Sequence, residues 1–316
     1  MPYQLDALDK RILGALTASP TASYAEIGKT AKCSKEVVNY RVKRLTEAGV
    51  IQGFVTIFWL GQSSYKILMQ FEKTTAKREK EIISYLTSHK NISWVTPCIG
   101  SHDLIFTIMT KDNEEFDIIL REVLEEIGDS MHDYKFAVSI QASTFGPRYA
   151  VELPKAIPSE KQKQWNLEFD DKDRIIADII RNNARISITD ICKQTKIPVE
   201  TIKYRIKKME ANSVIRRYRM ILNPLKLGFH RYEIFLRAAN LSNEFTKKFK
   251  GFAAQKQCIE YFDKCVGAWD FEFTACFKSS EQLRGFILEM KELFGEHIKS
   301  METVELFETY NYTYVL

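Results

Sequence analysis

The stretch Tyr40–Leu45 reads YRVKRL, and 164 residues later Tyr204–Met209 reads YRIKKM. The match continues without a gap on both sides, where the same offset pairs Asp6 with Asp170, Ile12 with Ile176, Ser23 with Ser187 and Val50 with Val214. Further along, the offset becomes 167, which aligns Gly100–Asp103 (GSHD) with Gly267–Asp270 (GAWD). A period this long is not that of a solenoid, and it indicates that a whole protein-sized unit has been duplicated.

Each repeat opens with a predicted helix-turn-helix segment. In the first copy, Asp6 is expected to cap a helix whose apolar residues recur at helical spacing, with Asp9 in its first turn. Ser23 and Glu26 form the S-x-x-E signature of a capped short helix, and Ser34 caps a third, basic helix that ends at Gly49. The second copy keeps this order, and Pro198 is expected at the first position of its third helix. A capped short helix, a tight turn and a basic helix are typical of DNA-binding proteins.

The third helix of each copy supplies most of the predicted DNA contacts. Val38, Val42 and Leu45 share its apolar face, so the residues on the other side are expected to face outward. Lysine and arginine there would reach phosphates or guanine edges, and asparagine can read adenine. The alternative is a solvated basic face. The candidates on these two helices are Lys35, Asn39, Tyr40, Lys43 and Arg44, and in the copy Lys203, Tyr204, Lys207 and Lys208.

The segment after each basic helix is predicted to be a β wing. It covers residues 50–57 in the first copy and residues 214–221 in the second. The second wing carries Arg216 and Arg217, with Arg219 two residues on, and these arginines would meet backbone phosphates.

The rest of each repeat follows a βαββαβ order. Strands are expected at 65–71, 92–99, 104–110 and 134–144, with helices at 77–89 and 114–127; in the second copy strands are expected at 232–238, 258–266, 271–277 and 301–314, with helices at 244–254 and 281–294. This is the ferredoxin-like arrangement. The predicted fold class is therefore α+β, with two copies of a winged helix-turn-helix domain, each followed by a ferredoxin-like domain. One sheet face needs a partner sheet, from the other half or from another chain.

Charge alternates along the 316 residues. Residues 1–60 carry a net charge of +3, residues 61–158 carry −3, residues 165–224 carry +5 and residues 225–316 carry −1. Alternating modules of this kind are expected to have separate partners. We call each winged helix-turn-helix domain a head and each βαββαβ domain a tail. The predicted order is a head at 1–60, a tail at 61–146, a Pro-containing polar linker at 147–168, a second head at 169–225 and a second tail at 226–316.

Several classes of protein are disfavoured by the composition. The six cysteines form no C-x-x-C pair, so we expect reduced thiols and neither a zinc site nor a disulfide framework. No apolar run reaches the length of a membrane span and no signal peptide is visible, which predicts a cytoplasmic protein with no membrane partner. P-loop, zincin and nucleophile-elbow motifs are missing, so no cofactor, metal or catalytic residue is predicted.

The basic YRVKRL helix, the Gly49–Ile51 stretch after it and a βαββαβ tail with Gly-x-x-Asp between its middle strands together resemble the Lrp/AsnC family of feast/famine regulators. The resemblance implies a transcription factor that binds double-stranded DNA, self-associates through its tails and binds a small effector, commonly an amino acid. The effector residues would be Gly100, His102 and Asp103, with Gly267, Trp269 and Asp270 in the copy.

A physical reason supports an effector at these turns. Glycine permits a positive φ, and the N–H groups of such a turn can hold a carboxylate. The alternative is a plain hairpin turn with a solvated aspartate.

Two other functions stay open. Siroheme decarboxylases are similar in fold to this family, and His102 lies near the pocket that such an enzyme would need, although the Arg-Arg-Phe-Gly run that those enzymes tend to show is missing. The other possibility is an architectural DNA binder that has no effector. A sequence-specific regulator, not an enzyme, is the function that we predict. The second copy departs from the first where Ser213 replaces Gly49 and Arg217 replaces Gly53.

Overall fold

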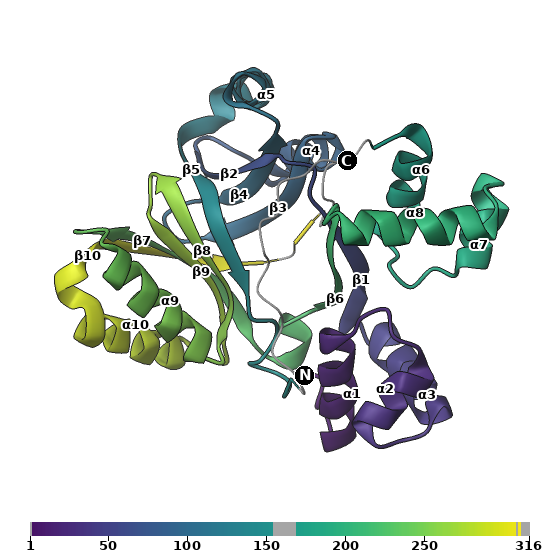
Figure 1. Cartoon of the computed structure of the whole chain (residues 1–316). Helices are drawn as coiled ribbons and strands as arrows, with labels where there is room; N and C mark the ends of the chain where they lie inside the picture. The colour runs from purple at the N-terminus through teal and green to yellow at the C-terminus, as the bar shows by residue number, and fades with distance from the viewer. Residues whose placement is uncertain (1, 154–168, 308, 311–316) are drawn as a thin grey trace. The chain divides into compact units, whose positions relative to one another are not determined.

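The structure is a computed structural model that describes residues 2–153, 169–307, 309 and 310. The described chain forms two compact units, and each unit combines one domain of the first repeat with the equivalent domain of the second (Figure 1). The head unit contains the described parts of Tyr3–Gln62 and Val151–Asn223, and the tail unit contains Pro2, Ser63–Ala150 and the described parts of Pro224–Asn311. Most of the predicted linker (154–168) and part of the last predicted strand (308 and 311–314) lie outside the described residues, and the five-part division of the chain stays a prediction.

The head helices form where local signals place them. The first head has helices α1 Ala7–Ala18, α2 Tyr24–Ala31 and α3 Lys35–Glu47, and the second has α6 Asp171–Arg181, α7 Ile188–Thr195 and α8 Val199–Ala211. Asp6, Ser23 and Ser34 cap the first three through their side chains, as predicted. Pro198 is the residue before α8 and not its first residue, a difference of one position.

The tight turn between the second and third helices is made without glycine. Lys32 and Lys196 end α2 and α7 in the left-handed conformation, with φ of 57° and 61°. Ser213 likewise adopts a positive φ, as Gly49 does at the equivalent position. The second head therefore keeps the backbone path of the first although it has lost the glycine.

Both predicted wing strands form, and they pair with each other as one ribbon that joins the two heads. Strand β1 Ile51–Phe58 of the first head pairs antiparallel with β6 Ile215–Leu222 of the second, from Ile51 opposite Leu222 to Phe58 opposite Ile215 (Figure 1). A lone strand leaves its N–H and C=O groups unpaired, and the equivalent strand of the other head satisfies them.

Further contacts join the two heads inside the head unit. Phe58 is 2% exposed and packs into the core of the second head, beside Ile176 and Ile202. The buried Thr56 hydroxyl donates to the Ile180 carbonyl at 2.7 Å. Arg185 of the second head also donates to the carbonyls of Pro20 and Ala22, at 2.5 and 2.9 Å. The heads are therefore held to each other directly, by side chains as well as by backbone pairing.

Each tail has the predicted βαββαβ order. The first comprises β2 Ser63–Phe71, α4 Ala76–Ser88, β3 Ile92–Ile99, β4 Leu104–Thr110, α5 Asn113–Ile127 and β5 Met131–Thr144; the second comprises β7 His230–Ala238, α9 Asn243–Gln255, β8 Ile259–Gly267, β9 Phe271–Phe277, α10 Ser280–Phe294 and β10 Ile298–Leu306. Strand orders are β5-β2-β4-β3 and β10-β7-β9-β8, which is the ferredoxin-like topology in both.

The two tail sheets join edge to edge into a closed eight-stranded barrel. One seam pairs β5 with β8, from Ala137 opposite Gly267 to Thr144 opposite Tyr261. The other pairs the end of β10 with β3, at Glu305 opposite Ile99 and Leu306 opposite Cys98. The partner sheet that each tail requires is thus the other tail of the same chain.

Three apolar clusters stabilise the tail unit. The first tail packs aliphatic residues such as Ile82 and Val123 between its sheet and its helices, whereas the second uses a phenylalanine-rich cluster that includes Phe249 and Phe273. The inner faces of the two sheets share a third cluster; its members are Leu68, Cys98, Ile105, Ala137, Phe235, Cys265, Trp269, Val304 and Leu306.

All six cysteines are free thiols, as predicted. Among the described residues, no helix is both long enough and apolar enough to cross a membrane.

Candidate nucleic-acid interface

The outer faces of α3 and α8 carry most of the predicted DNA-contact residues. Tyr40 is 63% exposed and Tyr204, its counterpart, is 66% exposed. The other exposed members are Lys35, Asn39 and Lys43 on α3, with Lys203 and Lys207 on α8. Lys43 lies within 3.9 Å of Glu47, and Lys203 lies 2.8 Å from Glu200, both as pairs along their own helix. Exposed pairs of this kind are weak, so these ammonium groups remain able to meet a phosphate.

Arg44 does not point outward as predicted. Its Nη2 atom lies 2.9 Å and 2.8 Å from the two carboxylate oxygens of Asp9, and its side chain is about one-third exposed. Asp9 is 1% exposed on α1, so Arg44 holds α3 against the first helix. The counterpart Lys208 is half-buried, and among the described residues no ion pair joins it to Asp173.

Two aspartates at the start of the first helix, predicted only to favour the helix N-terminus, organise each head. Asp9 bonds Arg41 at 3.0 Å, and Arg41 also bonds Asp6. In the second head Arg205 bonds Asp170 at 2.6 Å and Asp173 at 2.8 Å. A backbone hydrogen bond from Asp9, followed by the Arg41 contact, lowers the pKa of Asp6. The repetition of Asp-x-x-Asp and of the arginine at the same offset was the signal that could have revealed this clamp.

The arginines that were predicted on the second wing lie in the ribbon between the heads. Arg216 is half-buried, and its guanidinium lies over the ring of Trp59, 4.1 Å from the ring centroid. Arg217 and Arg219 are also half-buried. The predicted contact of Arg216 and Arg217 with phosphates stays a prediction.

The two Gly-x-x-Asp turns lie at the seams of the barrel. Gly100 and Gly267 both have a φ of +142°, in line with the predicted positive φ. A Cβ atom at Gly100 would lie 2.9 Å from the Thr303 carbonyl oxygen of β10, and one at Gly267 would lie 2.6 Å from the Phe136 carbonyl oxygen of β5. The glycines therefore serve the close approach of the two tails.

The aspartates of these turns are not simply exposed to solvent, because Asp270 is buried, Asp103 is half-buried and both accept backbone hydrogen bonds. Asp103 accepts the backbone N–H of Phe71 at 2.7 Å, and Asp270 accepts that of Ala238 at 2.8 Å. Each carboxylate thus fastens its turn to the end of the first strand of its own sheet. At the second turn, the Ala268 N–H donates to the Phe136 carbonyl at 3.0 Å, so it is engaged in barrel closure and not open to a ligand.

The remaining effector candidates are buried. His102 is 4% exposed, with its Nδ1 2.9 Å from the Ser101 hydroxyl and 3.8 Å from Glu302, and burial lowers the pKa of His102. Trp269 is 3% exposed and donates from Nε1 to Glu272 at 2.8 Å. The structure therefore places His102 beside Glu302, which forms an ion pair with Lys135, and Trp269 in the apolar cluster between the two sheets.

The barrel interior holds a charged cluster that was not predicted from the sequence. Lys66 of the first tail lies 2.8 Å from Glu233 and 2.5 Å from Glu272 of the second tail. Burial lowers the pKa of the Lys66 ammonium, but the two carboxylates outweigh it and the pKa lies well above its ordinary value. Strand alternation would have placed these residues inside, but only the pairing of the two tails shows that they meet.

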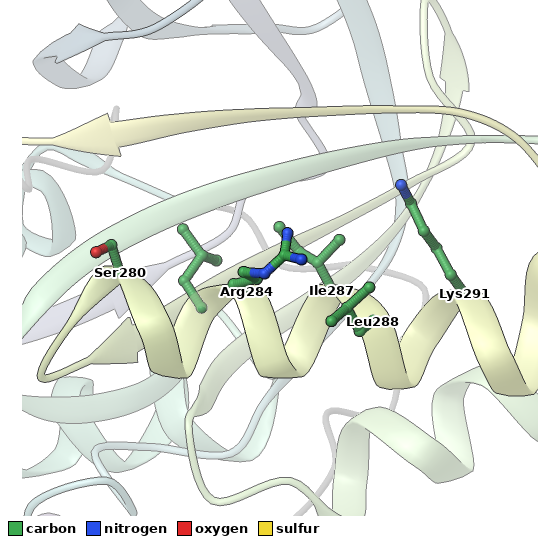
Figure 2. A pocket seen from close by; sticks show the side chains of 6 residues that line it. Ser280, Arg284, Ile287, Leu288 and Lys291 are labelled. Atoms are coloured by element: carbon green, nitrogen blue, oxygen red, sulfur yellow. The ribbon is translucent and has the colours of Figure 1, made fainter.

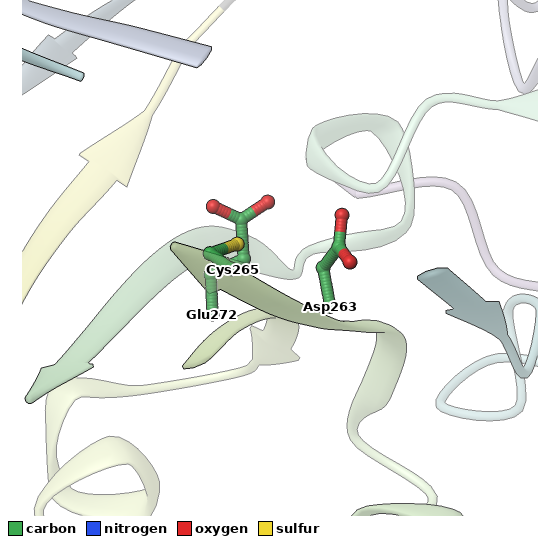
Figure 3. A group of neighbouring side chains, drawn as sticks. All are labelled: Asp263, Cys265 and Glu272. Carbon is green, nitrogen blue, oxygen red and sulfur yellow. The ribbon is translucent and has the colours of Figure 1, made fainter. Parts of the chain in front are cut away.

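Asp263, Cys265 and Glu272 extend from the same side of β8 and β9, with their ligand atoms within 4.8 Å of one another (Figure 3). Burial, followed by Glu272, raises the pKa of Asp263 to about 7. Both oxygens of Glu272 already accept hydrogen bonds, from Lys66 and from Trp269. A metal ion would have to displace an ammonium group from this cluster, so we assign no metal site here.

A shallow hollow on the outer face of α10 contains no predicted site residue (Figure 2). It is lined by Ser280, Leu283, Arg284, Ile287, Leu288 and Lys291.

Family models match both heads. The AsnC-type helix-turn-helix domain matches residues 5–46, and the winged helix-turn-helix DNA-binding domain matches residues 169–216. An uncharacterized HTH-type transcriptional regulator of Pyrococcus abyssi is 31% identical over 121 residues, which cover 38% of this chain and 82% of the relative. The HTH-type transcriptional regulator FL11 of the same organism is also 31% identical over 121 residues, with 38% of this chain and 80% of the relative covered.

Among solved structures, the siroheme decarboxylase NirDL is similar over 98% of this chain and 94% of its own, with a TM-score of 0.62 and 10% sequence identity. At this identity the likeness concerns the fold alone. AsnC of E. coli matches 44% of this chain and 94% of its own, with a TM-score of 0.37 and 22% identity.

Proposed function

Since this chain belongs to the Lrp/AsnC family of HTH-type transcriptional regulators, which bind DNA, we propose that it reads a specific DNA site with both of its heads. The observation that carries the proposal is the presence, in one head unit, of two third helices, α3 and α8, that expose tyrosine and lysine side chains. The DNA-contact residues in this proposal are Lys35, Asn39, Tyr40 and Lys43, together with Lys203, Tyr204 and Lys207.

The two heads are connected by the β1–β6 ribbon and by Arg185, so their spacing is a property of the head unit. Two recognition helices held in this way suit two half-sites on one duplex. The first head presents Lys35 and Asn39 where the second presents Val199 and Lys203, so we propose that the two half-sites differ.

The test is to select bound fragments from genomic DNA and to measure affinity for the recovered site across salt concentrations. The double variant Lys43→Ala/Lys207→Ala should weaken binding and reduce the slope of log K against log salt by about two, one for each lost phosphate contact. Lys90→Ala/Lys247→Ala removes the same charge from exposed tail positions and is the matched control. Equal salt slopes in the two variants would refute contact through α3 and α8, and a footprint that is independent of sequence would favour an architectural binder.

A small effector of amino-acid type is also part of the proposal, beside the first Gly-x-x-Asp turn (Gly100–Asp103). There the half-exposed pair Lys135 and Glu302 lies 2.9 Å apart, with Ser101 and His102 against Glu302. A lysine and a glutamate side by side offer partners for the carboxylate and the ammonium group of a free amino acid. The test is the thermal shift of the wild type in a panel of amino acids. An amino acid that stabilises the wild type but not Glu302→Gln supports the site, and equal shifts in both exclude it.

The second candidate function is a tetrapyrrole decarboxylase, which the likeness to NirDL along nearly the whole chain favours. His102 is the sequence-based candidate for such a site, and its ring is buried and bonded to Ser101. Addition of siroheme distinguishes the two functions: a new absorption band that is lost in His102→Ala supports the enzyme, and an unchanged spectrum with specific DNA binding supports the regulator.

A further inference from the structure

The two tails meet through positions that are counterparts in the repeat. At the offset of 167, Lys66 corresponds to Glu233 and Lys135 corresponds to Glu302. The structure brings each residue onto its own counterpart, with N–O distances of 2.8 Å and 2.9 Å. Only positions next to a twofold axis meet their own counterparts, so both pairs lie beside the pseudo-twofold axis that relates the tails.

The seam glycines give independent evidence of this axis. Gly100 approaches Thr303 and Val304, while Gly267 approaches Phe136 and Ala137. At the offset of 167, Thr303 is the counterpart of Phe136 and Val304 is the counterpart of Ala137. The first tail therefore makes the same contact with the second tail as the second makes with the first. The tails are therefore paired as the subunits of a symmetric dimer would be, although their sequences have diverged.

Positions 66 and 135 of the first tail and their counterparts 233 and 302 of the second are called axial positions here. In a pair of identical tails, each axial position would place like charge against like charge. Two first tails would bring Lys66 against Lys66, and two second tails would bring Glu233 against Glu233. Charges at such distances, taken out of water, are costly unless they are paired. In this chain the first tail has the cation and the second tail has the anion at both axial positions.

The surroundings of the pair Lys66–Glu233 make two like charges at this position still less favourable. Glu233 is 1% exposed and Glu272 is 6% exposed, and Lys66 contacts both. The Lys66 ammonium also lies 5.1 Å from the ring centroid of Trp94, while Thr274 donates to Glu233 at 2.8 Å. A second tail that paired with a copy of itself would bury both carboxylates without this cation.

We propose that the axial pairs Lys66–Glu233 and Lys135–Glu302 specify the partner of each tail: a first tail accepts a second tail and rejects another first tail. Both complementary tails are present in one chain, at a high effective concentration, so the barrel closes within a single chain. The interaction surface is the inner face of each tail sheet, and its partner is the other tail. This inference does not depend on the DNA-binding function.

The experiment uses two full-length variants. Lys66→Glu/Lys135→Glu makes the axial positions of both tails acidic, and Glu233→Lys/Glu302→Lys makes them basic. Each variant alone should unfold at a lower temperature than the wild type or fail to form a stable single-chain species. Refolded together, they should form a 1:1 two-chain complex in which acidic tails pair with basic ones, with recovered thermal stability and twice the 36.8 kDa mass of one chain.

Any folding failure of one variant is thus resolved by mixing: recovery in the mixture supports the proposal, and no recovery overturns it. Wild-type stability of either variant alone also overturns it. The pair Lys135–Glu302 allows a second charge-swap experiment, in which smaller effects are expected because the two side chains are 39% and 37% exposed. Lys135→Glu and Glu302→Lys should each lower Tm by a few degrees, about 2–4 °C per lost kcal/mol in a domain of this size. The double variant Lys135→Glu/Glu302→Lys should restore the Tm of the wild type. A loss of Tm in the double variant equal to the sum of the two single losses would contradict pairing by charge. No DNA is present in these measurements, so they are independent of the regulator assignment.

Discussion

Arg44, near the end of the basic helix of the first head, bonds both carboxylate oxygens of the buried Asp9 through a single nitrogen, at 2.9 and 2.8 Å. The residue with the most favourable chemistry for DNA is therefore committed to the packing of α3 on α1. Its neighbour Lys43 has a side chain that is 75% exposed, so the two adjacent cations have different roles.

Arg44→Ala should lower the free energy of unfolding by about 1–3 kcal/mol, because a buried carboxylate loses a charge-assisted hydrogen bond. Lys43→Ala should leave stability unchanged and reduce the salt slope of DNA binding by about one. Chemical unfolding and binding isotherms at several salt concentrations check both. A reduced salt slope for Arg44→Ala at unchanged stability would mean that its contact with Asp9 is replaced by one with a phosphate.

Arg185→Ala should loosen the contact between the heads. Its guanidinium donates to two carbonyls of the first head and lies 4.6 Å from the ring centroid of Tyr24 and 5.2 Å from that of Phe54. The expected result is weaker binding to a site with two half-sites and unchanged binding to one half-site alone. Arg121→Ala, which removes a 72% exposed arginine of the tail, is the control. An equal loss on both DNA probes would indicate that Arg185 acts within a single head.

Asn39→Lys should make the first head resemble the second at this position, and Lys203→Asn should do the converse. A bidentate asparagine–adenine contact discriminates between bases by about 1–3 kcal/mol, so each exchange should alter the preferred base in one half of the site and leave the other half unchanged. Selection and sequencing of bound DNA reads both halves at once. A palindromic site for the wild type would contradict the idea that the heads differ.

Gly267→Ala should destabilise the tail unit. The residue has a φ of +142°, and its Cβ would lie 2.6 Å from the Phe136 carbonyl oxygen and 2.7 Å from the Ala137 Cα, so strain and a clash with backbone combine. We expect a loss of about 2 kcal/mol or more. Gly285→Ala, in α10 with no atom within 4 Å, should stabilise the protein by up to about 1 kcal/mol. Thermal unfolding of the two variants side by side checks this, and tolerance of Gly267→Ala would mean that the β5–β8 seam can open.

Asp263→Asn should reduce the pH dependence of stability. The folded-state pKa of Asp263, about 7, lies above the ordinary value of 3.8, because of burial first and then Glu272. An acid with a raised folded-state pKa binds its proton more tightly when folded, so stability should decline as pH rises from about 4 to about 7. The expected loss is roughly 1–4 kcal/mol in the wild type. Urea unfolding at pH 5 and pH 7.5 should show less decline in the asparagine variant, and an equal decline in both proteins would show that Asp263 does not titrate in this range.

Local signals in the sequence predicted most elements correctly. The strands 92–99, 104–110 and 271–277 have the predicted bounds, and the caps Asp6, Ser23 and Ser34 are used as expected. The side of the helix on which Arg44 lies was not decided in this way. Arg44 is rotated by about 120° from Val38 around the helix axis, which puts it at the border between the apolar face and the exposed face. The direction of its side chain depends on where Asp9 of another helix lies.

The sequence by itself determined the duplicated plan, the order of elements in each repeat and the basic third helices, because periodicity, caps and turns act over a few residues. Only the tertiary structure decided that β1 pairs with β6, that the two tails close one barrel, and that Lys66 meets Glu233. Strand pairing across more than 150 residues uses the same backbone hydrogen bonds whichever strand is the partner, so no local pattern names that partner. The choice depends on which side chains come together after pairing, and the pairing of Lys66 with its own counterpart is one consequence of it.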